Sequence, residues 1–341
     1  MHCFRKMTGI FFLLATSFTY AQKKIQIENL VFEGAGIRGI AYAGAIKELE
    51  QKGLLKNVKR VGGTSAGAIT ALMLTLGYNA EEFTAIINST SFKKFNDGNF
   101  LFFGGVNRLA KYYGWYRGKQ FENWLSDLIA SKTGDANIDF TGLHQRSLKD
   151  LYITGTCLNK QQLIVFSYEN YPHMKVKDAV RISMGIPFYF EAVFIDSSGK
   201  VINQPKNKNG LDVMVDGGFV ANYPIRLFDS SRYFAVAEPN IFRTNPATIG
   251  FRIDSYEQIK RDADNKSLAP MPVNNLKDYV SAFYNIILES LNRQTLGEED
   301  WKRTISIFDG NIGPRIRKLS AEEVKILFEN GRSATRKFLQ D

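Results

Sequence analysis

The sequence is poor in cysteine and histidine, the residues that most often hold metals or activate nucleophiles. Its 341 residues include two cysteines and three histidines. Cys3 and His2 lie within the first 21 residues, which we expect to be removed, so Cys157, His144 and His173 remain. A single cysteine cannot form an internal disulfide, and cysteine and histidine form no cluster with metal-ligand spacing. We therefore predict neither an internal disulfide nor a metal site.

Long apolar runs are lacking beyond the N-terminus. Arg5 and Lys6 precede the apolar run Met7–Tyr20, and Ala21 offers a small residue for cleavage. This pattern is typical of a secretory signal peptide, because the apolar run is too short for a stable membrane anchor. We expect residues 1–21 to be a signal peptide and the mature protein to be exported to the periplasm, the medium or the outer surface.

Acidic residues are outnumbered by basic ones. Lysine and arginine total 44 against 34 aspartates and glutamates, which gives a net charge of +10. Loss of Arg5 and Lys6 with the signal peptide would lower this charge by two, to +8. A positive charge favours contact with anionic lipid surfaces or nucleic acids, and charge alone does not choose between them.

The segment Val61–Ile69 contains a G-x-S-x-G pentapeptide, with Ser65 between Gly63 and Gly67. The residues before it predict a short strand, and Ala66–Leu76 predicts a small apolar helix. A serine on the tight turn between a buried strand and a helix is strained, and its hydroxyl is exposed above the sheet edge. Glycines are needed where the two backbones pass closely. The helix N-terminus favours negative charge, as acyl transfer requires.

A glycine-rich turn, Gly34–Gly39, follows a predicted first strand at Lys24–Glu33. Its G-x-G-x-x-G pattern also suggests a dinucleotide site, but that site needs a carboxylate near the end of the second strand. Here the second strand ends in Gly62–Ser65, without an acid. We favour an anion-binding turn whose backbone amides form an oxyanion hole beside the serine. Arg38 would brace this loop or meet a phosphate.

The base that would activate Ser65 is best sought at Asp216. This residue ends an apolar strand predicted at Leu211–Val215 and is followed by two glycines. Ligand sites in parallel sheets lie at the carboxyl edge of the strands. A carboxylate in partly apolar surroundings has a raised proton affinity and can act as a general base. His144, in a polar loop, and His173, in a turn-like segment, are expected in solvent.

Strands and helices alternate along most of the chain, which predicts an α/β fold with three layers (α/β/α) and a mainly parallel central sheet. We expect residues 22–341 to form a single domain with a C-terminal helical extension at about 275–341. Further strands are predicted at Tyr233–Ala237, Ile249–Ile253 and Thr304–Phe308. Helices are predicted at Leu276–Leu296 and from a capping box at Ser320 to near Leu339.

The stretch Phe92–Tyr116 is rich in aromatic residues. Nine of its 25 residues are aromatic, four are basic and one is acidic. Amphipathic rings beside basic side chains suit a lipid interface or an active-site lid. The alternative is an insertion whose rings pack on the core, and the sequence leaves both open.

Three blocks, Gly34–Gly39, Gly63–Gly67 and Asp216–Gly218, resemble in order those of the patatin-like phospholipases. The resemblance covers roughly Leu30 to Leu339, and it includes a Ser-x-x-Ile-Pro segment starting at Ser183 and an Asn-Tyr-Pro run starting at Asn222. It implies that Ser65 is the nucleophile and Asp216 its dyad partner, with no histidine and no cofactor. The implied oxyanion-hole residues are Gly34, Ala35, Gly36 and Arg38, and the motif glycines are Gly39, Gly63, Gly67, Gly217 and Gly218.

Two positions depart from the resemblance. Ala35 stands where many members have glycine, which matters little if only its amide is used. Glu33 precedes the loop where a smaller or shorter residue is common, so the local charge stays open.

The resemblance implies a serine acyl hydrolase that acts on lipid carboxyl esters, with phospholipid or another acyl ester as its substrate, and the expected signal peptide implies that it is exported. We expect transient contact with a membrane surface and no nucleic acid, and the oligomeric state is open. The alternatives are a catalytically silent lipid- or membrane-binding protein of the same fold, an acyltransferase, and a nucleotide-binding protein that uses Gly34–Gly39.

Overall fold

The computed structural model describes residues 26–98, 103–146, 149–234, 243–264, 267–314 and 317–340. The predicted signal peptide and its cleavage site lie outside these ranges. Within them, an eight-stranded mixed sheet forms the centre of the molecule, with strand order β10-β9-β1-β2-β4-β8-β7 and β5 paired to β4. The bounds are β1 Asn29–Phe32, β2 Arg60–Gly63, β4 Asp150–Cys157, β5 Gln162–Phe166, β7 Val193–Ile195, β8 Asp212–Asp216, β9 Thr248–Asp254 and β10 Thr304–Phe308.

The five strands from β10 to β4 are parallel to one another. β8 pairs antiparallel with β4, and β5 and β7 also pair antiparallel with their neighbours. A small second sheet joins β3 (Gly114–Tyr116) and β6 (Phe188–Phe190). The mainly parallel sheet expected from the sequence is therefore confirmed, while the antiparallel placement of β8 and β7 at its edge was not predicted.

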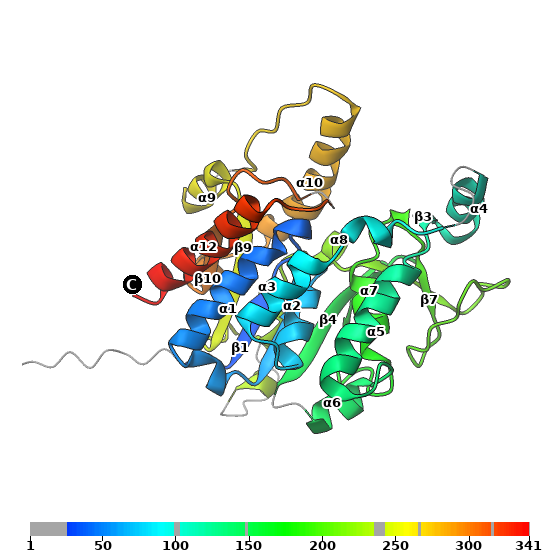
Figure 1. The fold of residues 1–341 in the computed structure, drawn as a ribbon, viewed down its shortest axis with the longest axis horizontal. Coiled ribbons are helices and arrows are strands. Elements are labelled where there is room, and N and C mark those ends of the chain that lie inside the picture. The colour runs from blue at the N-terminus through cyan, green and yellow to red at the C-terminus, as the bar shows by residue number, and fades with distance from the viewer. Residues whose placement is uncertain are drawn as a thin grey trace, which may run out of the picture.

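Helices cover both faces of the sheet. The α-helices are α1 Ala41–Gln51, α2 Ala66–Thr75, α3 Ala80–Ser89, α4 Phe103–Tyr112, α5 Lys119–Thr133, α6 Phe140–Arg146, α7 Val176–Ser183, α8 Gly218–Ala221, α9 Tyr256–Ala263, α10 Leu276–Gln294, α11 Glu298–Lys302 and α12 Ala321–Phe338. Short 3-10 turns lie at η1 Gly36–Ile40, η2 Leu54–Asn57, η3 Phe92–Phe95, η4 Ile225–Phe228 and η5 Ser231–Tyr233. Figure 1 shows α1 and α12 side by side in front of the strands.

The central strand β1 is buried on both faces, as expected in the middle of a parallel sheet. Leu30 and Phe32 point into the larger core, which lies beneath α1, α2 and α12. Val31 points the other way, into a smaller cluster with Tyr152 and Phe228. Successive side chains of β1 therefore pack on opposite faces of the sheet, one in each of the two clusters.

Several predicted elements change in the structure. The first strand is shorter than Lys24–Glu33 and covers Asn29–Phe32. The strand expected from Tyr233 is wrong at its start, because Tyr233 ends the 3-10 turn η5. Residues 235–242 lie outside the described ranges. The region 275–341 is more than a helical extension, because it supplies β10 to the central sheet and α12 to the layer that covers α1.

Most described rings of the stretch Phe92–Tyr116 pack against the body of the protein. Phe95 is buried against Phe121 and Trp124 of α5, and Tyr116 packs edge-on against Tyr189. Residues 99–102, which include two of the phenylalanines, lie outside the described ranges. None of the helices within those ranges is both long and apolar enough to cross a membrane.

Candidate active site

Ser65 occupies the turn between β2 and α2, where it is the residue before the first helical turn. Its backbone angles are φ 53° and ψ −119°, a region that residues with a Cβ seldom adopt, so the turn holds it under strain. Position 67 requires glycine, because a Cβ there would lie 2.2 Å from the Phe32 carbonyl oxygen. At Gly63 an added Cβ would lie 2.3 Å from the carbonyl oxygen of Gly67. The sequence-based explanation of these glycines is therefore confirmed.

The main chain and the side chain of Ser65 are both held from α7. The Ser65 amide donates to the Ser183 hydroxyl oxygen at 2.9 Å, and the Ser65 hydroxyl donates to the Met184 sulfur at 3.4 Å. The turn is also fixed to β4, because the hydroxyls of Thr64 and Thr154 share a hydrogen bond of 2.6 Å. Ser65 is 8% exposed, so the hydroxyl lies in a largely buried site.

Asp216 reaches the serine by a different route from the one expected. β8 is antiparallel to β4, so it begins at the edge of the sheet where the parallel strands end and runs in the opposite direction to them. It stops at Asp216, opposite Gly155, and the Asp216 amide donates to the Gly185 carbonyl at 3.0 Å. The structure places Asp216 near Ser65, but the argument from the carboxyl end of a parallel strand was wrong, because β8 runs antiparallel to β4.

Burial dominates the electrostatics of Asp216. The surrounding protein raises its pKa from 3.8 to about 7, because a carboxylate loses its hydration there. The Gly218 amide, which donates to Asp216 at 2.8 Å, and the nearby Ser65 hydroxyl favour the charged form and partly offset this rise. The Ser65 hydroxyl lies beside Asp216, while its hydrogen bond in this structure goes to the sulfur of Met184.

The glycine-rich loop passes directly beside the nucleophile turn. A Cβ added at Gly34 would lie 3.2 Å from the Ser65 Cβ. The Gly34 amide already donates to the Asn222 carbonyl at 3.0 Å, so Gly34 is unavailable as an oxyanion donor, contrary to the expectation. The Ile37 amide is also occupied. Among the described residues, the amides of Ala35 and Gly36 have no backbone acceptor, as at the start of a helical turn.

Arg38 and Glu33 flank this loop without entering the space beside Ser65. Arg38 donates to the Ala35 carbonyl at 3.2 Å and to Asp309 at 3.3 Å, so it braces the loop, one of the two roles expected for it. Glu33 is fully buried and pairs with Arg252 at 2.7 Å. Burial raises the pKa of Glu33, and the guanidinium of Arg252 opposes this rise.

Behind the loop, Asn222 joins three elements that lie far apart in the sequence. Its side-chain amide donates to the Gly34 carbonyl at 3.1 Å and to Glu289 of α10 at 3.0 Å. Its backbone amide donates to Asn292 of α10 at 2.7 Å. Glu289 in turn accepts from Arg252 at 2.8 Å. The conformation of the loop therefore depends on α10.

The two histidines lie at the surface, as expected. His144 stacks on Tyr168 and pairs with Asp150 at the start of β4, while His173 lies 3.5 Å from Asp139. Cys157 is buried and free. In the described ranges, no three histidine, cysteine or carboxylate side chains gather as metal ligands would.

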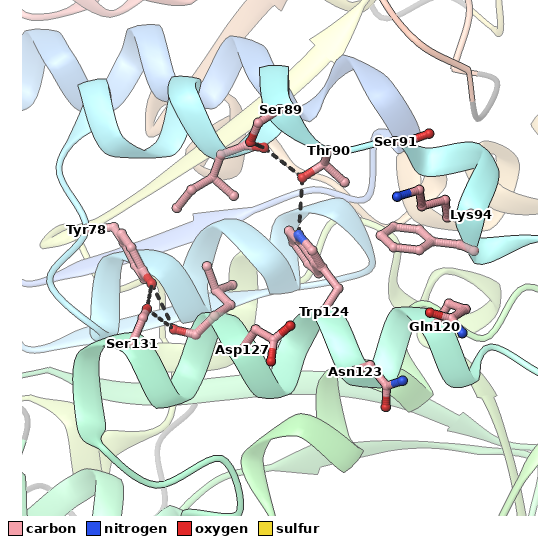
Figure 2. A pocket seen from close by; sticks show the side chains of 13 residues that line it. Tyr78, Ser89, Thr90, Ser91, Lys94, Gln120, Asn123, Trp124, Asp127 and Ser131 are labelled. Atoms are coloured by element: carbon pink, nitrogen blue, oxygen red, sulfur yellow. Dashed lines mark hydrogen bonds between the residues drawn. The ribbon is translucent and has the colours of Figure 1, made fainter.

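A cavity of about 480 Å³ lies between α3 and α5, away from the serine. Figure 2 shows Trp124 donating across it to Thr90 (3.1 Å) and Tyr78 bonded to Ser131. Neither Ser65 nor Asp216 lines this cavity, so it is separate from the candidate active site at the serine turn.

Two known proteins are similar to this chain in sequence. Uncharacterized protein R571 of Acanthamoeba polyphaga mimivirus is 28% identical over 309 residues, which span 90% of this chain and 91% of that protein. Uncharacterized protein YqhO of Bacillus subtilis is 34% identical over 212 residues, which span 59% of this chain and 67% of that protein.

The crystal structure of VipD from Legionella pneumophila aligns with a TM-score of 0.53 and 15% identity, covering 92% of this chain and 67% of that chain. A likeness at this identity shows the fold alone. The model of the patatin-like phospholipase family matches residues 30–229. Since that match spans more than half of the chain and contains the loop, the serine turn and the aspartate, the chain belongs to the patatin-like phospholipase family, a family of lipid hydrolases.

Proposed function

We propose that the protein is a serine acyl hydrolase that cleaves carboxyl esters of lipids. The observation that carries the proposal is the placement of the Ser65 hydroxyl beside Asp216, a buried carboxylate whose pKa burial raises to about 7. A general base works best when its pKa lies near the working pH. A buried carboxylate can therefore serve directly as the base. His144 and His173 lie at the surface, which is consistent with a base other than histidine.

In the proposed reaction, Asp216 takes the proton of Ser65 as the serine oxygen attacks the ester carbonyl carbon. The carbonyl oxygen becomes negative and accepts hydrogen bonds from the amides of Ala35 and Gly36, and the positive end of α2 favours this charge. The bond to the alcohol then breaks, and Asp216 gives its proton to the departing oxygen. Water, activated by the same carboxylate, attacks the acyl-serine, and the fatty acid leaves as Ser65 regains its proton.

Two substitutions test the dyad. Ser65→Ala and Asp216→Asn should each lower release of fatty acid from phospholipid vesicles, and of nitrophenol from a p-nitrophenyl ester, at least about a thousandfold. Ser198→Ala, in an exposed turn, makes the same chemical change away from the site and should retain full activity, as should His144→Ala. Full activity in either dyad variant would refute the proposal.

A fluorophosphonate probe separates catalysis from binding alone. Wild type should be labelled at Ser65, and Ser65→Ala should not. A well-folded wild type that resists labelling and releases no fatty acid would instead be a catalytically silent lipid-binding protein. Adding an acceptor alcohol to the assay would show whether the acyl group passes to an alcohol in preference to water, as in an acyltransferase.

We also propose export of the protein, supported by the basic start and the apolar run Met7–Tyr20. N-terminal sequencing of the protein from its producing cell should begin at Gln22. A mature protein that still begins at Met1 would contradict export by this signal.

A further inference from the structure

The exposed apolar side chains of this protein are concentrated in one place. Among the described residues, half of the large apolar side chains that are exposed lie between positions 271 and 286. Five of them occupy the N-terminal part of α10 at helical spacing, so they share one side of the helix. We call these five residues the outer face of α10: Leu276, Tyr279, Val280, Phe283 and Ile286.

The outer face is exposed to an unusual degree. Leu276 is 78% exposed and Phe283 is 54% exposed, although both are residues that proteins normally bury. Between residues 267 and 288 the sequence contains one lysine and one acidic residue, Asp278. The carboxylate of Asp278 is engaged at the start of the helix, where it accepts from the Asn274 amide at 3.3 Å and from the Asn275 side chain at 2.9 Å. The face is therefore a nearly uncharged apolar surface, and contiguous surfaces of this kind mark interaction sites.

The same helix is anchored to the candidate active site by its other half. Glu289 and Asn292 hold Asn222, which in turn holds the loop at Gly34. Leu288 packs against α8, where a Cβ added at Gly218 would lie 3.2 Å from it. In Figure 1, α10 projects outward from the body of the protein.

Further apolar groups lie between the outer face and the serine turn. The Tyr284 hydroxyl donates to the Pro187 carbonyl at 3.2 Å, and the Tyr284 ring meets Phe219 of α8. The next residues in each of these segments, Phe188 and Val220, are themselves exposed. The apolar surface of α10 is thus continuous with the elements that follow Asp216 and Met184.

We propose that the outer face of α10 docks on a lipid surface and seats the active site there. This proposal rests on the proposed lipid substrate, because a face joined to an ester-cleaving site meets its substrate in the bilayer. Mixed aromatic and aliphatic side chains on one side of a helix bind the boundary between lipid headgroups and acyl chains. The net charge of +8 that remains without residues 1–21 adds long-range attraction to anionic membranes.

Vesicle sedimentation with the mature protein, beginning at Gln22, tests the docking. The experiment is done in the Ser65→Ala background, so that the lipid is not consumed. Vesicles are phosphatidylcholine with a minor share of phosphatidylglycerol. Phe283→Asp removes a ring from the outer face and adds a charge, and it should weaken binding about tenfold or more. Tyr256→Asp, at an exposed ring on α9 (71% exposed), is the matched control and should bind as the parent does.

The outcomes separate the docking from the catalysis. In the catalytically competent background, Phe283→Asp should lose hydrolysis of vesicles but keep hydrolysis of a soluble p-nitrophenyl ester. Unchanged vesicle binding by Phe283→Asp, or an equal loss in Tyr256→Asp, overturns the docking whatever Ser65 does. A dimer that Phe283→Asp converts to monomer, with vesicle binding unchanged, would assign the face to a second copy of the chain and also overturn it. Weakened binding supports the docking even if wild type proves unable to hydrolyse any ester.

Discussion

Replacing Asp216 with asparagine should stabilise the protein while it removes the proposed base. Burial raises the pKa of this carboxyl from 3.8 to about 7, so the folded protein resists its ionisation. The gap between these values corresponds to about 4 kcal/mol of free energy of unfolding. Asparagine keeps the shape of the side chain, and its carbonyl can still accept the Gly218 amide. Above about pH 7 the folded wild type must bury an ionised carboxylate, which lowers its free energy of unfolding, and the variant carries no such charge.

The sign of the effect follows from proton binding. Below about pH 4 the carboxyl is neutral in both the folded and the unfolded chain, so it has no pH-dependent effect. Between about pH 4 and pH 7 the folded chain keeps the proton that the unfolded chain has lost, so stability of the wild type falls as the pH rises. The stability of Asp216→Asn relative to wild type should therefore grow across this range by up to about 4 kcal/mol, and then become constant.

Urea unfolding at a series of pH values measures this difference. Glu33, whose pKa burial also raises, is present in both proteins, so its contribution cancels when one curve is subtracted from the other. The activity of the wild type should show the same titration, with kcat/KM rising through about pH 7 as Asp216 loses its proton. A stability difference that stays flat from pH 4 to about pH 8 would refute the assignment of a raised pKa to this residue.

Two further pairs of substitutions probe the packing and the buried charges, each by urea unfolding. Gly44→Ala should lower the free energy of unfolding by about 1–3 kcal/mol, because its Cβ would lie 1.8 Å from the Phe328 carbonyl oxygen. Gly313→Ala is the control, because a Cβ at position 313 meets nothing within 4 Å and should leave the stability unchanged. Equal stability of the two variants would contradict the close packing of α1 on α12. Arg252→Met should cost about 3–5 kcal/mol because it strips carboxylates of their partner. Glu33→Gln should cost much less, since burial already favours its neutral form, and the reverse order would disprove this account.

The serine turn could be read from the sequence because its determinants are local. A strand, a tight turn and a helix lie within a few residues of Ser65, and the glycines on either side are required by contacts within that unit or with the adjacent strand. Asp216 was found for a less secure reason. The two glycines after it marked the end of a strand, but no local signal gives the direction of that strand in the sheet.

The supports of the site could not be read from the sequence, because they join distant segments. Nothing near Asn222 indicates that Glu289 and Asn292 will meet it, and nothing near Met184 indicates that its sulfur will accept from Ser65. The occupation of the Gly34 amide has the same origin, since its acceptor lies 188 positions away, on the residue whose side chain also holds the loop. A pattern of residue types identifies candidate groups, while their hydrogen-bond partners depend on tertiary packing.

The placement of β1 between β2 and β9 governs how the chain can be assembled during synthesis. β2 follows soon after β1, but the other partner arrives late, since Asn29 and Thr248 are 219 positions apart. Until the ribosome has released β9, the innermost strand has one bare edge of unpaired amides and carbonyls, the kind of edge that invites aggregation. The strand that pairs with this edge of β1 therefore lies beyond residue 229, where the family match ends. The central sheet cannot be completed until most of the chain has been synthesised.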